Sequence, residues 1–163
     1  KCHVTMMWNQ LFKYAYKEGC DYFVQIGDDI KFKTHNWLFD CVYTLQNQNN
    51  IGMAGPVSNN TRILTQSVVS RKHMEIFNYY FPPSIKNWFC DDWINEVYNS
   101  KNMLYVLRSH YCENAGGEPR YNINNDADFN NNIRHNFNVL KEKSKFVIDE
   151  GKARLHKYLQ KIK

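Results

Sequence analysis

Short apolar runs alternate with segments of helical periodicity along this chain, and that alternation predicts an α/β fold. The predicted strands are 21–26, 51–55, 63–70 and 103–107. The predicted helices are 5–19, 37–46, 71–79, one that starts at Asp91 or Asp92, and a long one at the C-terminal end. A loop at 112–121 and an irregular stretch at 122–138 are expected before this last helix. We expect Thr5 to cap the first helix, Gly19 to close it and Pro56 to stop the second strand.

The overall composition is typical of one soluble globular domain. The chain has 163 residues, of which 43% are hydrophobic and 23% are charged. No apolar run reaches the roughly 18 residues that a transmembrane helix needs, so no membrane span is expected. The chain opens without a methionine or a signal peptide, and we expect it to be part of a longer chain.

The net charge of +5 lies entirely in the segment 141–163. This segment has eight Lys/Arg and three Asp/Glu, whereas residues 1–140 carry thirteen of each. The charge pattern separates a neutral core, 1–140, from a basic C-terminal helix, 141–163. A solvated helix face is the simplest interpretation of that helix, and contact with an anionic membrane surface or a nucleic acid is the alternative. The sequence has no nucleic-acid-binding motif, so no nucleic-acid partner is expected.

The cysteines indicate a reducing compartment. Cys2, Cys20, Cys41, Cys90 and Cys112 are odd in number and have no CxxC spacing. This pattern disfavours both a disulfide framework and a structural zinc site. We therefore expect reduced, mostly buried thiols and a cytoplasmic location, in the host cytoplasm if the protein is viral.

Two adjacent carboxylates follow the first predicted strand. Gly27-Asp28-Asp29 comes directly after the apolar run 21–26, and ligands of open α/β sheets gather at the carboxyl ends of strands. Adjacent carboxylates repel each other unless a cation or hydrogen-bond donors neutralise them. The sequence therefore favours Mg²⁺ or Mn²⁺ at Asp28 and Asp29, with a polar turn as the alternative, because Gly-Asp-Asp also suits a turn.

A second acidic pair, Asp91-Asp92, lies among aromatic residues in the segment NWFCDDW. An aspartate is a favoured helix N-cap, and that role explains one of the two residues. The other is free to act as a general base whose pKa is set by its apolar surroundings.

Five blocks of the chain resemble successive motifs of the GT-A-fold glycosyltransferases. In chain order they are DYFVQIGDDI, NIGMAGP, ILTQSVVSRKHMEIF, NWFCDDWINEVY and NAGGEPRY, which together span 21–121. The resemblance is nearest to the type found in protists and large viruses, including chlorella viruses. It implies a GT-A-like, Rossmann-like mixed sheet flanked by helices. It also implies transfer of a sugar, with inversion, from a UDP- or GDP-type nucleotide-sugar donor to a hydroxyl of a glycan or other acceptor.

The resemblance assigns the donor site to two regions. Asp29 falls on the metal-ligand position of the family's Asp-x-Asp motif, where Gly27 replaces the first acid and Asp28 shares the contact with the metal and the donor. Gln66 falls in the region that faces the donor sugar and the acceptor.

The resemblance also assigns the catalytic residues. Asp92 matches the member of the acidic pair that usually acts as the base, and Asp91 lies next to it. A histidine late in the fold often completes the metal site. His110 is the better candidate by position, and His135 is the other.

The family builds its nucleotide pocket largely from an N-terminal β-α-β portion that precedes the acidic motif. Only one helix precedes that motif here, so the resemblance implies that part of this nucleotide-binding half is lacking. We therefore expect about half of a donor site and an uncovered edge on the first strand. No GxGxxG or Walker loop is found either.

Two other functions stay open at this point. One is a non-catalytic, glycosyltransferase-like module that binds carbohydrate or acts as a scaffold. The other is a phosphoryl or glycosyl hydrolase, for which paired carboxylates would also serve. Aromatic side chains could stack on sugar rings in each case, although most aromatic residues belong to cores. The candidates are Tyr79, Tyr80, Phe81, Trp88 and Trp93.

Overall fold

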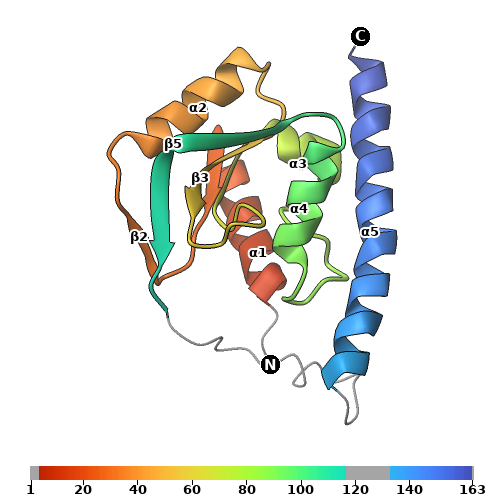
Figure 1. Cartoon of the computed structure of the whole chain (residues 1–163). Helices are drawn as coiled ribbons and strands as arrows, with labels where there is room; N and C mark the ends of the chain where they lie inside the picture. Colours follow the sequence, from red (N-terminus) through yellow and green to blue (C-terminus); the bar gives the residue numbers. More distant parts are fainter. Residues whose placement is uncertain (1–3, 117–132, 163) are drawn as a thin grey trace.

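The computed structural model describes residues 4–116 and 133–162, and within them the fold is mixed α/β, as expected (Figure 1). The helices are α1 (Val4–Lys17), α2 (Trp37–Asn47), α3 (Lys72–Phe77), α4 (Cys90–Asn99) and α5 (Ile133–Lys161). The strands are β1 (Tyr22–Gln25), β2 (Ile30–Phe32), β3 (Met53–Ser58), β4 (Ser67–Ser70) and β5 (Leu104–Asn114).

The five strands form one curled sheet in the order β1-β4-β3-β5-β2. β3 and β5 are parallel, and the other neighbouring pairs are antiparallel. β1, β3 and β5 therefore run in the same direction, with β4 and β2 against them. Within the described residues β1 pairs with β4 alone and lies at one edge of the sheet, which leaves its other side open.

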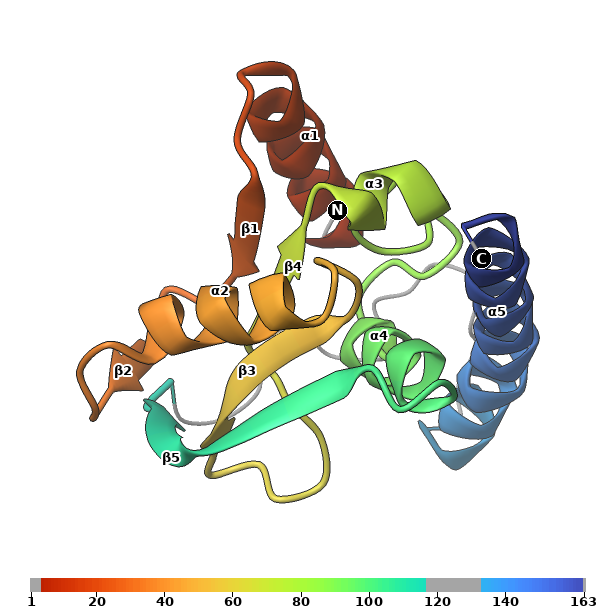
Figure 2. The same cartoon turned by 90° about the horizontal axis from the view of Figure 1, so that it is seen from above.

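We expect the 163-residue chain to self-associate at this edge. α1 lies beside β1 (Figure 2) and leaves Met7, Leu11 and Tyr14 exposed at 54%, 59% and 66%. An open strand edge next to a row of apolar side chains favours pairing with a second chain. The double substitution Met7→Lys and Leu11→Lys should shift the distribution toward monomer in sedimentation velocity, because lysine resists burial.

The matched control for that experiment is Phe146→Lys on α5, where the phenylalanine is 74% exposed. This control introduces lysine at an exposed apolar position on another element, so it should leave the association unchanged. A wild-type chain that stays monomeric up to about 100 μM, within the concentration range in which exposed edges aggregate, would show that the edge is protected.

Helices cover both faces of the sheet, because its strands alternate their side chains between two cores (Figure 2). In β1, Phe23 points to the larger core, and Tyr22 and Val24 pack against the smaller one. The smaller core lies under α2 and includes Cys41, Leu45, Ala54 and Val68. The larger core lies under α1, α3, α4 and α5 and includes Phe12, Phe77, Trp93, Ile94, Tyr98 and Leu155.

The C-terminal helix is part of the larger core. α5 begins at Ile133, earlier than the boundary at 141 that its charge pattern suggested, and it packs along α4 (Figure 1). A Cβ atom on Gly151 would lie 2.7 Å from Nε1 of Trp93, so only glycine permits this close approach of the two helices. Trp93 donates its indole N–H to the carbonyl of Val147 at 3.2 Å. Among residues 4–116 and 133–162, no helix combines the length and apolar character that crossing a bilayer requires.

Pro56 does not stop the second strand, contrary to expectation. β3 continues through it to Ser58, and its register against β5 shifts between Pro56 and Val57, which pair with Leu107 and Tyr111. A proline cannot donate to a strand ladder, and sheets tolerate it where the ladder is irregular. The bulge next to Pro56 is such a position.

The last strand is longer than expected and it bends. β5 includes the start of the segment 112–121 that was predicted to be a loop, and its end pairs with β2, where Asn114 is opposite Ile30. Residues 108–110 have no partner in β3, and the strand turns sharply in this region (Figure 1). β2, which the sequence pattern did not predict, is the short strand that receives the turned part of β5.

Gly19 closes the first helix as predicted, but Thr5 does not cap its start. Thr5 lies within α1 and is buried, and its hydroxyl donates to the carbonyl of Lys86 at 3.2 Å. It therefore fastens α1 to the segment before α4, and does not cap its own helix. Gly19 has a φ of 88°, and the following amide, that of Cys20, donates to Ala15 at 3.1 Å, which closes the helix.

The N-cap of α4 is not an aspartate, contrary to the prediction. The helix begins at Cys90, and its N-cap is Phe89, in the left-handed conformation with φ 72°. Asp91 and Asp92 both lie in the first turn of the helix, so neither is the capping residue. Their carboxylates are placed near the positive end of the helix dipole.

The cysteines within the described residues are free, as expected. Cys41, Cys90 and Cys112 are buried, and Cys20 is exposed. Burial raises the pKa of the Cys41 thiol to about 12, with the nearby Asp40 adding to the effect. Cys2 lies outside the described residues.

Candidate functional site

The first acidic pair connects the end of β1 to the start of β2. The end of β5 lies against this turn, because the amide of Ala115 donates to the carbonyl of Asp29 at 2.9 Å. The Ile30–Asn114 pair of the β2–β5 ladder comes next to that bond. The acidic turn is thus held by a strand more than 80 residues away in sequence.

Two glycines leave the space that the Asp29 carboxylate takes. A Cβ atom on Gly27 would lie 2.6 Å from Oδ1 of Asp29, and a Cβ atom on Gly116 would overlap Oδ2 of the same carboxylate. Any side chain at either position would displace the carboxylate. Gly116 belongs to the block NAGGEPRY, but the sequence analysis gave it no role.

Gln66 is placed against the acidic turn. Its side chain is 3% exposed, and its Oε1 accepts the amide proton of Gly27 at 3.3 Å. Its Nε2 donates to the hydroxyl of Thr65 at 3.3 Å. The structure therefore brings together Gln66 and the turn that carries Asp28 and Asp29.

The bridging loop, residues 59–66, joins β3 to β4 and is fixed at both ends. Asn59 and the backbone of Asn114 exchange two hydrogen bonds of 3.0 Å. Asn95 of α4, which is buried, exchanges hydrogen bonds of 3.0 and 2.8 Å with the backbone of Leu64. Part of this loop, 63–66, was predicted as strand, and the strand proper is only Ser67–Ser70.

The second acidic pair meets the bridging loop through an ion pair. The guanidinium of Arg62 donates to Oδ1 of Asp92, whose side chain is 20% exposed. Burial, and to a lesser extent the negative charge of Asp92, raise the pKa of Asp91 to about 7, while Arg62 opposes the shift. Adjacent aspartates in one helical turn therefore have different surroundings, one ion-paired near solvent and the other desolvated.

His110 lies away from the acidic turn. It is buried, with Nε2 at 2.7 Å from Oδ2 of Asp40 and Nδ1 at 3.1 Å from the hydroxyl of Thr34. It precedes Asn114 by four residues, which is roughly 13 Å along an extended strand. Both of its ring nitrogens are engaged with side chains near α2, so this geometry gives His110 a structural role. The side chain of His135 lies outside those that the structure describes.

The acidic turn supplies some, but not all, of the ligands that a hard divalent cation needs. Within the described parts of the chain, no group of three or more His, Cys, Asp or Glu side chains is arranged to hold a metal. Mg²⁺ is commonly held by one or two carboxylates together with substrate phosphates, and Asp28 and Asp29 supply oxygen ligands of that kind. Gly27 and Gly116 leave the Asp29 carboxylate next to backbone without side chains.

A cavity of about 370 Å³ lies beside the second acidic pair, between the bridging loop, β5 and α4. Its walls include Ser58, Thr61, Arg62, Leu64, Val106 and Arg108. Its volume is in the range of small-molecule pockets, roughly 300 to 1,000 Å³. Arg62 lines the cavity and also binds Asp92, and it therefore connects the cavity to this acid.

Most of the aromatic residues considered for sugar stacking are in the core. Trp93 and Phe81 are fully buried, and Tyr80 is nearly so. Trp88, just before α4, is 38% exposed. Trp88 is therefore the candidate among these for contact with a sugar ring.

Comparisons of the chain with models of protein families, with curated proteins and with solved structures found no match. No family is shown, and function has to be inferred from the residues of the site.

Proposed function

We propose that this chain is the catalytic portion of a metal-dependent glycosyltransferase that moves a sugar from a nucleotide-sugar donor to an acceptor hydroxyl, with inversion. The observation that carries the proposal is the bridging loop, which contacts both the acidic turn and the second acidic pair. At its end Gln66 accepts from Gly27 of the acidic turn, and in its middle Arg62 binds Asp92. One loop thus links a candidate metal site to a candidate base, as a transfer reaction between two substrates requires.

The arrangement of the sheet also supports the proposal. The acidic turn follows the carboxyl end of β1, which is parallel to β3 and β5, and ligands of α/β sheets bind at such ends. The open edge of β1 is where an additional part of a nucleotide-binding sheet would attach in a GT-A-like fold.

Asp29 and Asp28 would hold Mg²⁺ or Mn²⁺ together with the donor diphosphate. Bound there, the cation supplies charge neutralisation for the leaving nucleoside diphosphate. Gln66 keeps the acidic turn in place through the amide of Gly27, and Gly116 keeps space for the Asp29 carboxylate.

Asp92 acts as the general base. Its carboxylate takes the proton of the acceptor hydroxyl while the hydroxyl oxygen forms a bond to the anomeric carbon of the donor. The bond from that carbon to the diphosphate oxygen breaks on the opposite face, and the nucleoside diphosphate leaves with the bonding electron pair. Arg62 orients the Asp92 carboxylate through their ion pair.

The metal assignment is tested by Asp29→Asn. We expect this substitution to weaken Mn²⁺-dependent binding of UDP- or GDP-sugars by about a hundredfold or more, because a metal ligand is lost. Gly116→Ala should weaken the same binding by about tenfold, because its methyl group displaces the Asp29 carboxylate. Isothermal titration calorimetry with and without Mn²⁺ measures both effects.

Asp21→Asn is the matched control, because Asp21 is exposed and precedes the opposite end of β1. It should leave donor binding unchanged. Unaltered metal-dependent binding in Asp29→Asn would remove Asp29 from the metal site. Donor binding by the wild type without any transfer would instead favour the non-catalytic module.

A further inference from the structure

The cavity beside Asp92 is lined by residues that have no role in the proposed reaction so far described, among them Arg108. Its wall carries two guanidinium groups, Arg62 and Arg108, and no acidic residue. Apolar side chains, including Ile63, Leu104 and Val106, form much of the rest of the lining, together with uncharged polar side chains. A ligand that fits this wall has an apolar or ring-like body and a negative group at one end.

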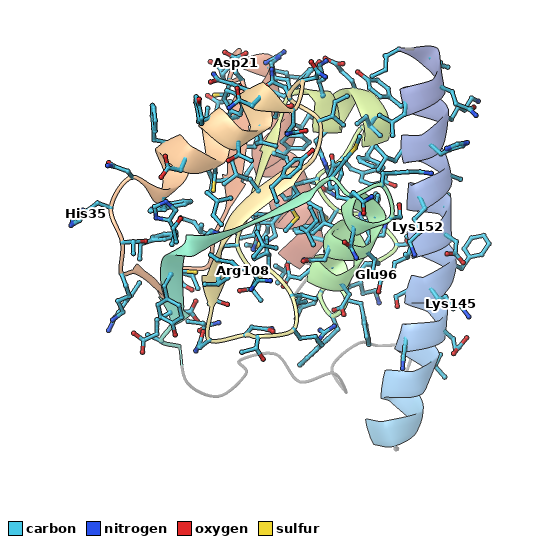
Figure 3. All side chains as sticks on the ribbon, turned by 45° about the horizontal axis from the view of Figure 1, so that its top comes forward. Asp21, His35, Glu96, Arg108, Lys145 and Lys152 are labelled. Atoms are coloured by element: carbon cyan, nitrogen blue, oxygen red, sulfur yellow. The ribbon has the colours of Figure 1, made fainter. Side chains whose placement is uncertain are left out.

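The regular alternation of β5 places Arg108 at this cavity, because Leu104, Val106 and Arg108 all line it. The bulge then turns His110 away. Residues 108–110 have no partner in β3, and a bulge of this kind redirects side chains from their regular alternation. His110 is bonded to Asp40 on α2, whereas Arg108 lines the cavity. Figure 3 shows Arg108 between β5 and the bridging loop.

The two arginines differ in what they already bind. Arg62 is ion-paired with Asp92. Arg108 is exposed, and across residues 4–116 and 133–162 it makes no hydrogen bond or ion pair. The nearby hydroxyl of Thr61, also in the lining, likewise has no hydrogen-bond partner in this part of the chain. A planar guanidinium with its donors unused is suited to bidentate binding of a carboxylate or phosphate.

We propose that this cavity binds the acceptor, and that the acceptor carries an oxyanion, a carboxylate or a phosphate monoester, which Arg108 and Thr61 receive. This inference rests on the transferase function proposed above. With its oxyanion at Arg108 and its ring over Val106, an acceptor sugar extends toward Arg62 and Asp92, where its hydroxyl is deprotonated. The acceptor class is therefore an acidic sugar or a sugar phosphate.

The test measures binding alone and needs neither donor nor metal. The probes are glucose 6-phosphate, glucuronate and neutral glucose, titrated into the ¹⁵N-labelled 163-residue chain without divalent cations. We expect the two anionic probes to shift the amide signals of the bridging loop and of residues 106–109, and glucose to do so much more weakly. Arg108→Gln should weaken binding of the anionic probes by about tenfold or more, the scale for losing a charged hydrogen-bond partner.

Arg154→Gln is the matched control, since it makes the same substitution on α5, where Arg154 binds Glu150. It should leave the dissociation constants unchanged. Arg108→Lys keeps the charge and loses the bidentate geometry, so it should retain part of the affinity. Equal binding of glucose and glucose 6-phosphate, or equal binding of glucose 6-phosphate by wild type and Arg108→Gln, would overturn the proposal.

A second titration, with UDP, separates the acceptor from the donor. If Arg108→Gln weakens binding of UDP and not of glucose 6-phosphate, the cavity belongs to the donor diphosphate and the acceptor assignment is wrong. Failure of the transferase proposal has a different signature. In that case the oxyanion binds through Arg108, but metal-dependent binding of nucleotide sugars is absent.

Discussion

Asp91→Asn should make the protein more stable at pH 8, by about 2 to 4 kcal/mol, although it removes an acid from the first turn of a helix. Burial raises the pKa of Asp91 from 3.8 to about 7 in the folded protein. The folded state therefore binds more protons than the unfolded state between these values, so its stability falls as the pH rises from about 4 to about 7 and is level above that. A shift of about three pKa units corresponds to at most about 4 kcal/mol, at 1.36 kcal/mol per unit.

Urea unfolding at pH 4 and pH 8 measures this effect. At pH 4 the wild type and Asp91→Asn should have similar stability, since the buried carboxyl is protonated in the folded state. At pH 8 the variant should be more stable, because asparagine carries no charge to bury. Asp149→Asn, at an exposed position on α5, is the control and should track the wild type at both pH values.

A variant that is less stable than the wild type at pH 8 would contradict this prediction. Such a result would mean that Arg62 and the N-terminus of α4 stabilise the ionised Asp91 more than burial destabilises it. Loss of a helix cap is not an alternative explanation, because the N-cap of α4 is Phe89.

The fold class and several elements could be predicted from local patterns. The apolar run 21–26 and the periodic segment 37–46 correspond closely to β1 and α2, because β1 packs side chains against both cores and α2 buries one face. Gly19 closes α1 for a reason that is also local, the left-handed backbone that glycine permits. Where a segment's own side chains decide its structure, the sequence was sufficient.

The second half of β5 could not be predicted, because its structure depends on distant strands. Residues 108–110 are polar and form a bulge, so the alternation typical of a strand is interrupted there. Its partner β2 has only three residues, too few to show a period. For the same reason His110, which follows the predicted strand 103–107, was proposed as a metal ligand, whereas its actual partner, Asp40, is 70 residues away on α2.

The acids of the candidate site gave a signal in the sequence, whereas two of the residues around them, Arg62 and Gly116, were not predicted. Asp29 and Asp92 were proposed because each belongs to a pair of adjacent carboxylates at the start or end of an element. Arg62 gave no signal in a polar loop, since the Asp92 that it binds is 30 residues away. Gly116 had one usable signal, its place in the block NAGGEPRY, because a glycine permits the close approach of another group.

Asp92→Asn should lower the turnover of sugar transfer by about a hundredfold or more, with little change in donor affinity, because a general base acts in the transition state and not in donor binding. Initial rates at saturating donor, and the donor Kd from calorimetry, separate the two quantities. Asp149→Asn is again the control.

The adjacent Asp91 makes this experiment decisive about which acid is the base. Asp92 is the ion-paired acid that meets the cavity through Arg62, so Asp92→Glu should recover part of the turnover, and Arg62→Gln should lower it by misorienting the carboxylate. If the loss of turnover occurs in Asp91→Asn instead, the roles are exchanged. In that case the wild-type rate should fall as the pH decreases around 7, where Asp91 takes up its proton. Arg62→Gln should move the midpoint of this pH profile upward, because Arg62 lowers the pKa of Asp91.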